Sequence, residues 1–155
     1  MAPHTSDWDV VYSMGAAELL GVNIQVLIVD RLFKGIRGPI LRSLGGIPVN
    51  KEKNEGMVSK AVQLFKEREE LILAVNPEGG KYKCKRFRTG FYQIAKQANV
   101  PIYLFYVDYQ KKVVGVGPKF VAANSMEDDL RSIWNYYKDK RGKYPENGMV
   151  GEVPL

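Results

Sequence analysis

Short apolar runs alternate with amphipathic patterns of helical spacing along most of this 155-residue chain. Residues 23–29, 71–75 and 101–109 are strand-like runs, and Met57, Ala61 and Leu64 between them recur at about 3.6-residue spacing. Strands and helices in alternation build sheets whose faces are covered by helices. The sequence therefore predicts an α/β fold, a single layered domain over residues 1–155 with a mixed, mostly parallel sheet flanked by helices.

The remaining elements follow from helix signals and turn residues. Leu71–Val75 is apolar on both faces, which favours a central strand. Residues 145–155 are predicted to be a loose tail. The sequence also predicts a helix capped by Ser6 or Asp7, whose apolar residues Trp8, Val11, Tyr12, Leu19 and Leu20 share roughly one face. It predicts a helix over 40–44 with Pro39 at its first position, an extended piece at 47–49, a helix over 89–98 and a hairpin partner at 111–117. A last helix is predicted to open at Ser125 with Asp128 and to bury Leu130, Ile133, Trp134 and Tyr137.

Composition excludes several classes of protein. Hydrophobic residues make up 45% of the chain, enough for a packed core. The longest apolar runs have five or six residues, far below the roughly 18 that a membrane-spanning helix needs. One cysteine, Cys84, forms no internal disulfide and no structural zinc site. The acidic N-terminal segment shows no export signal, and a single cysteine fits a reducing compartment, so we expect a cytoplasmic location. Because CxxC and Cys/His pairs are absent from the sequence, we expect no metal.

The net charge of +6 favours anionic partners: polyanions, anionic lipid surfaces or phosphorylated small molecules. Arg31–Lys51 holds five cations and no acid, and Lys81–Arg88 holds five cations in eight positions. The second stretch also contains aromatic residues, a combination that single-stranded nucleic acids bind. Most basic runs are solvated loops, so nucleic acid is the disfavoured alternative.

His4 is the only histidine, and Asp9 stands five residues after it. A carboxylate at this distance, across one tight turn into a capped helix, can reach Nδ1 of the imidazole and leave Nε2 as a general base. This arrangement is the base and orienting half of a catalytic triad, without a protein nucleophile. The alternative is a chance pairing, because seven aspartates in 155 residues place one at a chosen offset about once in 22 cases, so the pair alone is a weak signal.

Two glycine-containing turns carry the other candidate residues. Gly45-Gly46-Ile47-Pro48-Val49-Asn50-Lys51 lets backbone amides approach a ligand and ends on a charge. Asn76-Pro77-Glu78-Gly79-Gly80-Lys81 follows the most apolar strand and aims one carboxylate, several amides and a lysine at a strand end. Each segment is also compatible with an ordinary turn.

Taken in order, these segments closely resemble the glycerolipid acyltransferase family, the lysophosphatidic acid (1-acylglycerol-3-phosphate) acyltransferase group. His4 and Asp9 match its H-x4-D motif, and residues 46–49 match its G-x-I-P-V motif, with Asn50 and Lys51 replacing an acid and an arginine. Residues 77–79 match its P-E-G motif, with Asn76, Gly80 and Lys81 departing from the pattern, and residues 100–102 match an apolar V-P-I stretch. The sequence A-P-H-T-S-x-W-D resembles that of a small bacterial branch of this family.

The resemblance implies phospholipid biosynthesis by acyl transfer from a coenzyme A or acyl carrier protein thioester to the hydroxyl of a lysophospholipid or glycerol-phosphate-like acceptor, without a cofactor. His4 would be the base, oriented by Asp9. Backbone amides or Lys81 would stabilise the oxyanion, and Lys51 with Lys81 would hold a phosphate. The resemblance also implies substrate-binding roles for Gly46, Ile47, Glu78, Gly79 and Gly80, with Glu78 an orienting carboxylate. Lysine replaces a bidentate arginine grip by a point charge, so the acceptor can differ from a simple glycerol phosphate.

Three residues before His4 are too few for the strand that normally precedes such a site, so we expect an upstream extension of the functional chain and a poorly held terminus. The resemblance also implies that the protein contacts the inner face of a membrane peripherally, through a basic face and Phe33, Phe87 and Phe91. The alternative on the same fold is a non-catalytic lipid or phosphate binder.

Overall fold

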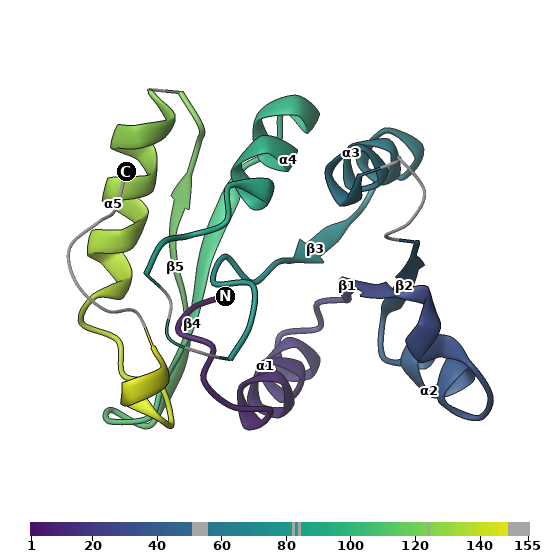
Figure 1. The fold of residues 1–155 in the computed structure, drawn as a ribbon, viewed down its shortest axis with the longest axis horizontal. Helices are drawn as coiled ribbons and strands as arrows, with labels where there is room; N and C mark the ends of the chain where they lie inside the picture. The colour runs from purple at the N-terminus through teal and green to yellow at the C-terminus, as the bar shows by residue number, and fades with distance from the viewer. Residues whose placement is uncertain (51–55, 82, 84, 124, 149–155) are drawn as a thin grey trace.

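The computed structural model describes residues 1–50, 56–81, 83, 85–123 and 125–148 and has the predicted α/β fold (Figure 1). Helices and strands alternate except for two consecutive strands before the last helix, and a 3₁₀ turn follows the first strand and the last helix. The elements are α1 (Trp8–Leu19), β1 (Ile24–Val29), η1 (Asp30–Phe33), α2 (Arg37–Ser43), β2 (Gly46–Val49), α3 (Met57–Glu67), β3 (Ile72–Ala74), α4 (Gly90–Ala98), β4 (Ile102–Asp108), β5 (Val113–Phe120), α5 (Met126–Tyr137) and η2 (Pro145–Asn147).

The strands form two sheets. Three parallel strands lie in the order β2-β1-β3, with Val26 of β1 opposite both Gly46 and Ala74. β4 and β5 form an antiparallel pair, which confirms the predicted hairpin. The prediction that residues 71–75 are the central strand is wrong, because β1 is central and β3 is at the edge of its sheet. Apolar residues on both faces of a strand report what covers those faces and not how many strands lie beside it.

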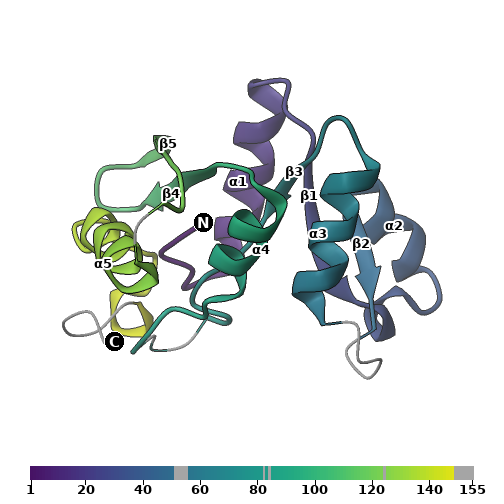
Figure 2. The same cartoon turned by 90° about the horizontal axis from the view of Figure 1, so that it is seen from above.

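The first residues of the chain lie between the two sheets (Figures 1 and 2). The amino nitrogen of Met1 donates to the carbonyl of Val75 at the end of β3, at 2.9 Å, and Ala2 N–H donates to Phe105 O of β4, at 3.3 Å. Ala2 is completely buried. The expectation of a poorly held terminus is therefore wrong, since the segment that leads to His4 is anchored on both sides.

The largest packed cluster lies between β4, α5 and the segment before α4. Phe87 contacts Trp134 and Tyr137 through tilted and edge-to-face ring pairs, and the Tyr137 hydroxyl donates to Phe105 O at 3.0 Å. Aromatic pairs of this kind add stabilisation beyond the burial of their area. This cluster holds the sheet on which the N-terminal segment rests. Its buried members are Ala2, Phe87, Leu104, Ile133, Trp134 and Tyr137.

Local sequence signals predicted the start of one helix correctly and the start of another incorrectly. Ser125 Oγ accepts from Asp128 N–H at 3.2 Å at the start of α5, as predicted, although Leu130 is only half-buried. α2 begins at Arg37, so Pro39 is its third residue rather than its first. Proline is tolerated there because the first-turn N–H groups have no acceptor within the helix.

Two further regions differ from expectation. The shared face of α1 is exposed, and Leu19 is 90% accessible to solvent. In the predicted tail, residues 145–147 form η2, and residues 149–155 lie outside the described part of the chain. Across the described helices, none combines the length and the apolar character required to cross a bilayer.

Candidate active site

His4 and Asp9 are brought together at the start of α1. His4 Nδ1 lies 3.2 Å from Asp9 Oδ2. The Asp9 side chain is fully buried, whereas 13% of the His4 side chain remains accessible. The turn between them is closed by Asp9 N–H donating to Ser6 O, so the carboxylate in the first helical turn points back toward the imidazole. The pair therefore has the geometry of a base whose ring is held by a carboxylate.

Four groups hold the Asp9 carboxylate. Oδ2 accepts from the backbone N–H groups of Thr5 and Ser6, at 2.8 and 2.9 Å, in addition to its contact with His4. Oδ1 accepts from the hydroxyl of Tyr109 at 2.7 Å. Burial raises the pKa of Asp9, but the hydrogen bonds from His4, Tyr109, Ser6 and Thr5 outweigh it, so the pKa lies below its usual value. Asp9 is therefore ionised at neutral pH, as an orienting carboxylate must be.

Glu78 approaches His4 from the turn after β3. Its Oε2 accepts the backbone N–H of His4 at 2.9 Å, and 8% of the residue is accessible. Among the described residues, Oε1 of this side chain has no hydrogen-bond partner. Burial raises the pKa of Glu78 to about 7, although the hydrogen bond from His4 N–H opposes the shift. The glutamate is thus a backbone clamp on His4 that exchanges a proton near neutrality.

The turn that carries Glu78 is closely folded. Asn76 Oδ1 accepts Glu78 N–H at 3.0 Å, and Asn76 Nδ2 reaches Gly80 O at 3.5 Å. Gly79 has a φ of +73°, a backbone conformation that residues with a Cβ rarely adopt, so glycine is favoured here. The pattern Pro-Glu-Gly-Gly therefore aims the Glu78 carboxylate inward while Gly79 itself stays at the surface.

Lys81 connects this turn to the start of α1. Its Nζ forms an ion pair with Asp7 Oδ1 at 2.6 Å, and both side chains are exposed. Exposed pairs contribute little to stability, about 0–1 kcal/mol. The pair shows instead that the lysine lies on the same side as the His4 turn. An anionic group of a ligand could compete with Asp7 for it.

The structure does not bring the Gly46 segment to the same place. β2 lies on the far side of β1 from the N-terminus in both views (Figures 1 and 2). Gly46 is buried against the carbonyl of Leu41, and a Cβ on Gly45 would meet the carbonyl of Ile24. The two glycines thus allow the turn after α2 to pack on β1. Ile47 is opposite Leu27 in β1, and the predicted phosphate ligand Lys51 lies outside the described residues.

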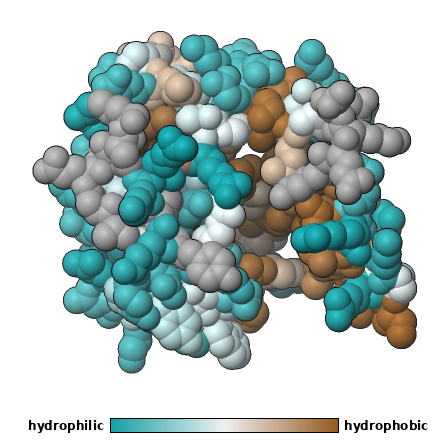
Figure 3. Space-filling view, in the orientation of Figure 1, coloured by the Kyte–Doolittle hydropathy of each residue, from teal (hydrophilic) through white to brown (hydrophobic). Residues whose placement is uncertain are grey.

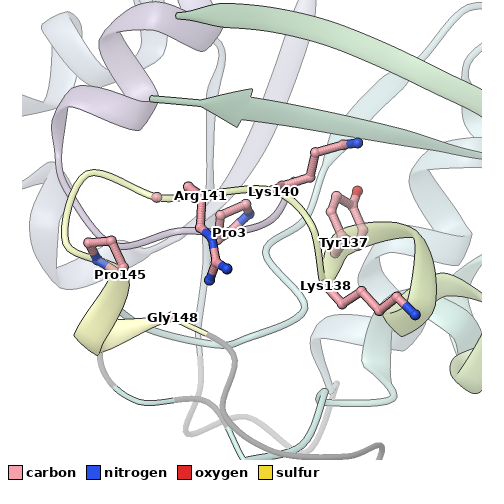
Figure 4. A pocket seen from close by; sticks show the side chains of 8 residues that line it. Pro3, Tyr137, Lys138, Lys140, Arg141, Pro145 and Gly148 are labelled. Carbon is pink, nitrogen blue, oxygen red and sulfur yellow. The ribbon is translucent and has the colours of Figure 1, made fainter. Parts of the chain in front are cut away.

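Sequence reasoning missed Tyr109. It follows β4, 100 positions from Asp9, and no spacing rule links the two residues. The C-terminal segment also contacts the His4 turn, since Tyr144 N–H donates to Thr5 Oγ1 at 3.2 Å. A small pocket beside Pro3 marks this junction, and Figure 4 shows the residues that line it. They are Pro3, Tyr137, Lys138, Lys140, Arg141, Gly142, Pro145 and Gly148.

Glu78→Gln is expected to stabilise the protein in alkaline solution. In the folded chain the carboxyl keeps its proton up to a pKa of about 7, whereas in the unfolded chain it ionises above 4.5. Stability from this group is therefore present below pH 4.5 and falls as pH rises toward 7. Glutamine is neutral throughout and still offers an oxygen to His4 N–H. The free energy of unfolding at pH 8.5 should rise by roughly 2–3 kcal/mol.

Urea unfolding at pH 4 and pH 8.5 measures this effect. The difference between wild type and Glu78→Gln should shrink toward pH 4. Glu127→Gln, which changes a carboxylate that is 55% exposed on α5, is the control and should stay within about 0.5 kcal/mol of wild type. An equal effect of Glu78→Gln at both pH values would contradict a raised pKa of Glu78 in the folded chain.

Comparison with known proteins identifies the family of the chain. A sequence model of the family described as Acyltransferase matches residues 1–107, which include the His4–Asp9 pair and the Glu78 turn. Searches of the curated proteins and of the solved structures returned no match. The match covers more than half of the chain and ends within β4. A match of this extent shows that the chain belongs to the acyltransferase family, the family of the lysophosphatidic acid acyltransferases.

Proposed function

We propose that this acyltransferase moves a fatty acyl group from a coenzyme A or acyl carrier protein thioester to the hydroxyl of a lysophospholipid or a glycerol-phosphate-like acceptor. The observation that carries the proposal is the 3.2 Å contact between His4 Nδ1 and the buried, ionised Asp9. This contact leaves Nε2 of a partly accessible imidazole as the base.

The chemistry balances without a protein nucleophile. Nε2 of His4 takes the hydroxyl proton while the acceptor oxygen bonds to the thioester carbonyl carbon, and Asp9 stabilises the imidazolium that forms. The tetrahedral intermediate collapses as the C–S bond breaks, and the leaving sulfur takes the proton from the imidazolium. The reaction forms one ester and one thiol and regenerates neutral His4.

Charge near His4 supports binding of an anionic acceptor. Lys81 lies beside the His4 turn through its ion pair with Asp7, and in our proposal it exchanges that partner for the acceptor's phosphate or for the oxyanion. Lys51 would supply a second cation, with Gly46 and Ile47 shaping the strand before it. Gly79, Gly80 and Glu78 would shape the wall nearest the base.

Thiol release coupled to product identification tests this function. The purified chain is mixed with acyl-CoA or acyl carrier protein donors and a panel of acceptors: glycerol 3-phosphate, lysophosphatidic acid and zwitterionic lysophospholipids. We expect one acylated product by mass spectrometry, and His4→Ala should abolish it. Activity that survives His4→Ala would contradict the mechanism, and lysolipid binding without turnover would favour a non-catalytic binder on this fold. Binding that is steeply salt-dependent and selective for nucleic acid would favour a nucleic-acid-binding domain.

The proposed membrane contact involves α2. Of the three phenylalanines expected to contact lipid, Phe87 is buried in the core cluster and Phe91 packs against it. Phe33 is half-buried, and Arg42 lies over its ring at 5.2 Å. Instead Ile36, Ile40 and Leu44 are exposed beside Arg37 and Arg42; we call these five residues the α2 surface. Apolar side chains gather on this half of the molecule (Figure 3). Exposed apolar residues among cations favour the surface of an anionic bilayer.

Removing two of these apolar side chains should weaken membrane binding. We expect Ile36→Asp with Ile40→Asp to reduce partitioning onto phosphatidylglycerol-containing vesicles by roughly tenfold or more, because each exposed apolar side chain contributes on the order of 1 kcal/mol and the new charges are repelled. Vesicle sedimentation measures this. Val121→Asp, which alters a residue that is 57% exposed outside the α2 surface, is the control and should bind like wild type. Equal binding by all variants would exclude the α2 surface.

A further inference from the structure

Tyr109 is the feature of the site that the family match does not contain. The match ends at residue 107, and Tyr109 follows β4. β4 belongs to a different sheet from β3, the strand that precedes Glu78. Its hydroxyl donates to Asp9 Oδ1 at 2.7 Å, the oxygen that the His4 turn leaves without a donor. The three groups of that turn, His4 Nδ1 and the two backbone N–H groups, all contact Oδ2.

We propose that Tyr109 is a positioning residue for acyl transfer, acting on His4 through Asp9. The inference rests on the proposed function. A carboxylate held at one oxygen can rotate about its Cβ–Cγ bond, whereas a donor on the other oxygen fixes the plane of the group. With the plane fixed, Oδ2 stays directed at Nδ1, and the imidazole keeps the orientation that presents Nε2 to the acceptor.

The hydroxyl is suited to this task. Burial, together with the charge of Asp9, raises the pKa of Tyr109, so its hydroxyl keeps its proton at physiological pH. It is therefore a permanent donor, and its bond to an ionised acceptor is of the strong, charge-assisted kind. In return, this bond is one of those that keep Asp9 ionised.

Tyr109 is itself held in place. Its backbone N–H donates to Arg141 O at 2.8 Å, and its ring packs edge-on against Tyr12 of α1, with centroids 5.9 Å apart. The segment after α5 then returns to the His4 turn, where Tyr144 N–H donates to Thr5 Oγ1. The C-terminal segment therefore contacts both Tyr109 and the His4 turn, the two parts of the chain that hold the Asp9 carboxylate. This places a residue beyond the matched region in the catalytic arrangement.

Tyr109→Phe tests the proposal because it removes the hydroxyl and keeps the ring. We expect kcat to fall roughly tenfold with KM unchanged, since Tyr109 contacts Asp9 rather than substrate. Loss of a hydrogen bond that lowers the pKa of Asp9 should also move the acid limb of the pH–rate profile upward. The other titratable groups near the pair include Glu78, the buried Met1 amino group that interacts with Glu78, the Asp7–Lys81 ion pair, Tyr12 and Tyr144. Tyr12→Phe, which removes the hydroxyl of the neighbouring ring, is the control and should change neither kcat nor the profile.

A double-mutant cycle separates action through Asp9 from a structural effect. In the Asp9→Asn background, Tyr109→Phe should lower kcat less than about twofold, because the charged carboxylate through which it acts is gone. An undiminished tenfold loss in that background, or a changed KM, would overturn the proposal.

A measurement without turnover separates this inference from the proposed function. Because His4 is the only histidine, its imidazole nitrogens give unambiguous NMR signals. At pH 8.5 we expect the Nδ1–H tautomer to predominate in wild type and in Tyr12→Phe, and to lose population in Tyr109→Phe. The Tyr109 hydroxyl proton of wild type should exchange slowly, which can be observed even if the variant does not fold. An unchanged tautomer ratio or a rapidly exchanging hydroxyl would overturn the positioning role, whatever the reaction proves to be.

Discussion

His4→Ala is expected to lower the rate of acyl transfer by about 10³-fold, within the range of roughly 10²- to 10⁴-fold for loss of a general base. The substitution removes the imidazole and leaves the backbone N–H that donates to Glu78, so the turn keeps its clamp. The fold should survive, because the His4 ring lies outside the core cluster. Initial rates of thiol release, with circular dichroism as the folding control, measure the effect.

His4→Gln provides the matched comparison. Glutamine can place an amide hydrogen near Asp9 but cannot accept a proton from the acceptor hydroxyl. It should therefore be as inactive as His4→Ala while retaining the thermal stability of wild type. A folded His4→Gln protein with more than a few per cent of wild-type activity would show that another group is the base.

Asp9→Ala is expected to have the largest effect on stability. The change leaves the buried N–H groups of Thr5 and Ser6 and the partly buried hydroxyl of Tyr109 without their acceptor. Each buried donor without a partner costs about 1–3 kcal/mol, so the free energy of unfolding should fall by roughly 3–5 kcal/mol. The rate should fall as well, because the imidazole loses the carboxylate that orients it.

The pH dependence of unfolding gives the sign of this contribution. The pKa of Asp9 is lower in the folded chain, so its stabilisation is present above the pKa of the unfolded chain. It is lost as pH falls through the folded pKa. Asp9→Ala should therefore make the free energy of unfolding less dependent on pH in acid solution. Asp7→Asn, in the same segment but 86% exposed, is the stability control, and a loss as large as that of Asp9→Ala would point to a general effect on the turn.

Local signals in the sequence predicted most of the elements. Ala61 and Leu64 are buried on one face of α3 as their spacing predicted, although Met57 of the same predicted face is exposed, and the Ser125 cap is formed. The same kind of signal was wrong for α1, whose apolar face is exposed, and for the place of β3 in its sheet. Periodicity reports which residues share a face but not which face or edge another element covers.

The contacts of the site likewise fall into those that local sequence predicts and those that it does not. His4 and Asp9 are separated by five residues and one turn, so local geometry alone brings the imidazole and carboxylate into reach, and the Pro-Glu-Gly turn can be recognised at the end of a strand. These short-range relations are what the sequence by itself determined, together with the α/β class. Only the tertiary structure decided that Glu78 clamps the backbone of His4, that the Gly46 turn packs on β1, and that Tyr109 holds the far oxygen of Asp9. Those contacts join residues far apart in the chain, and their partners are set by how the two sheets dock on the N-terminal segment, which no spacing along the chain records.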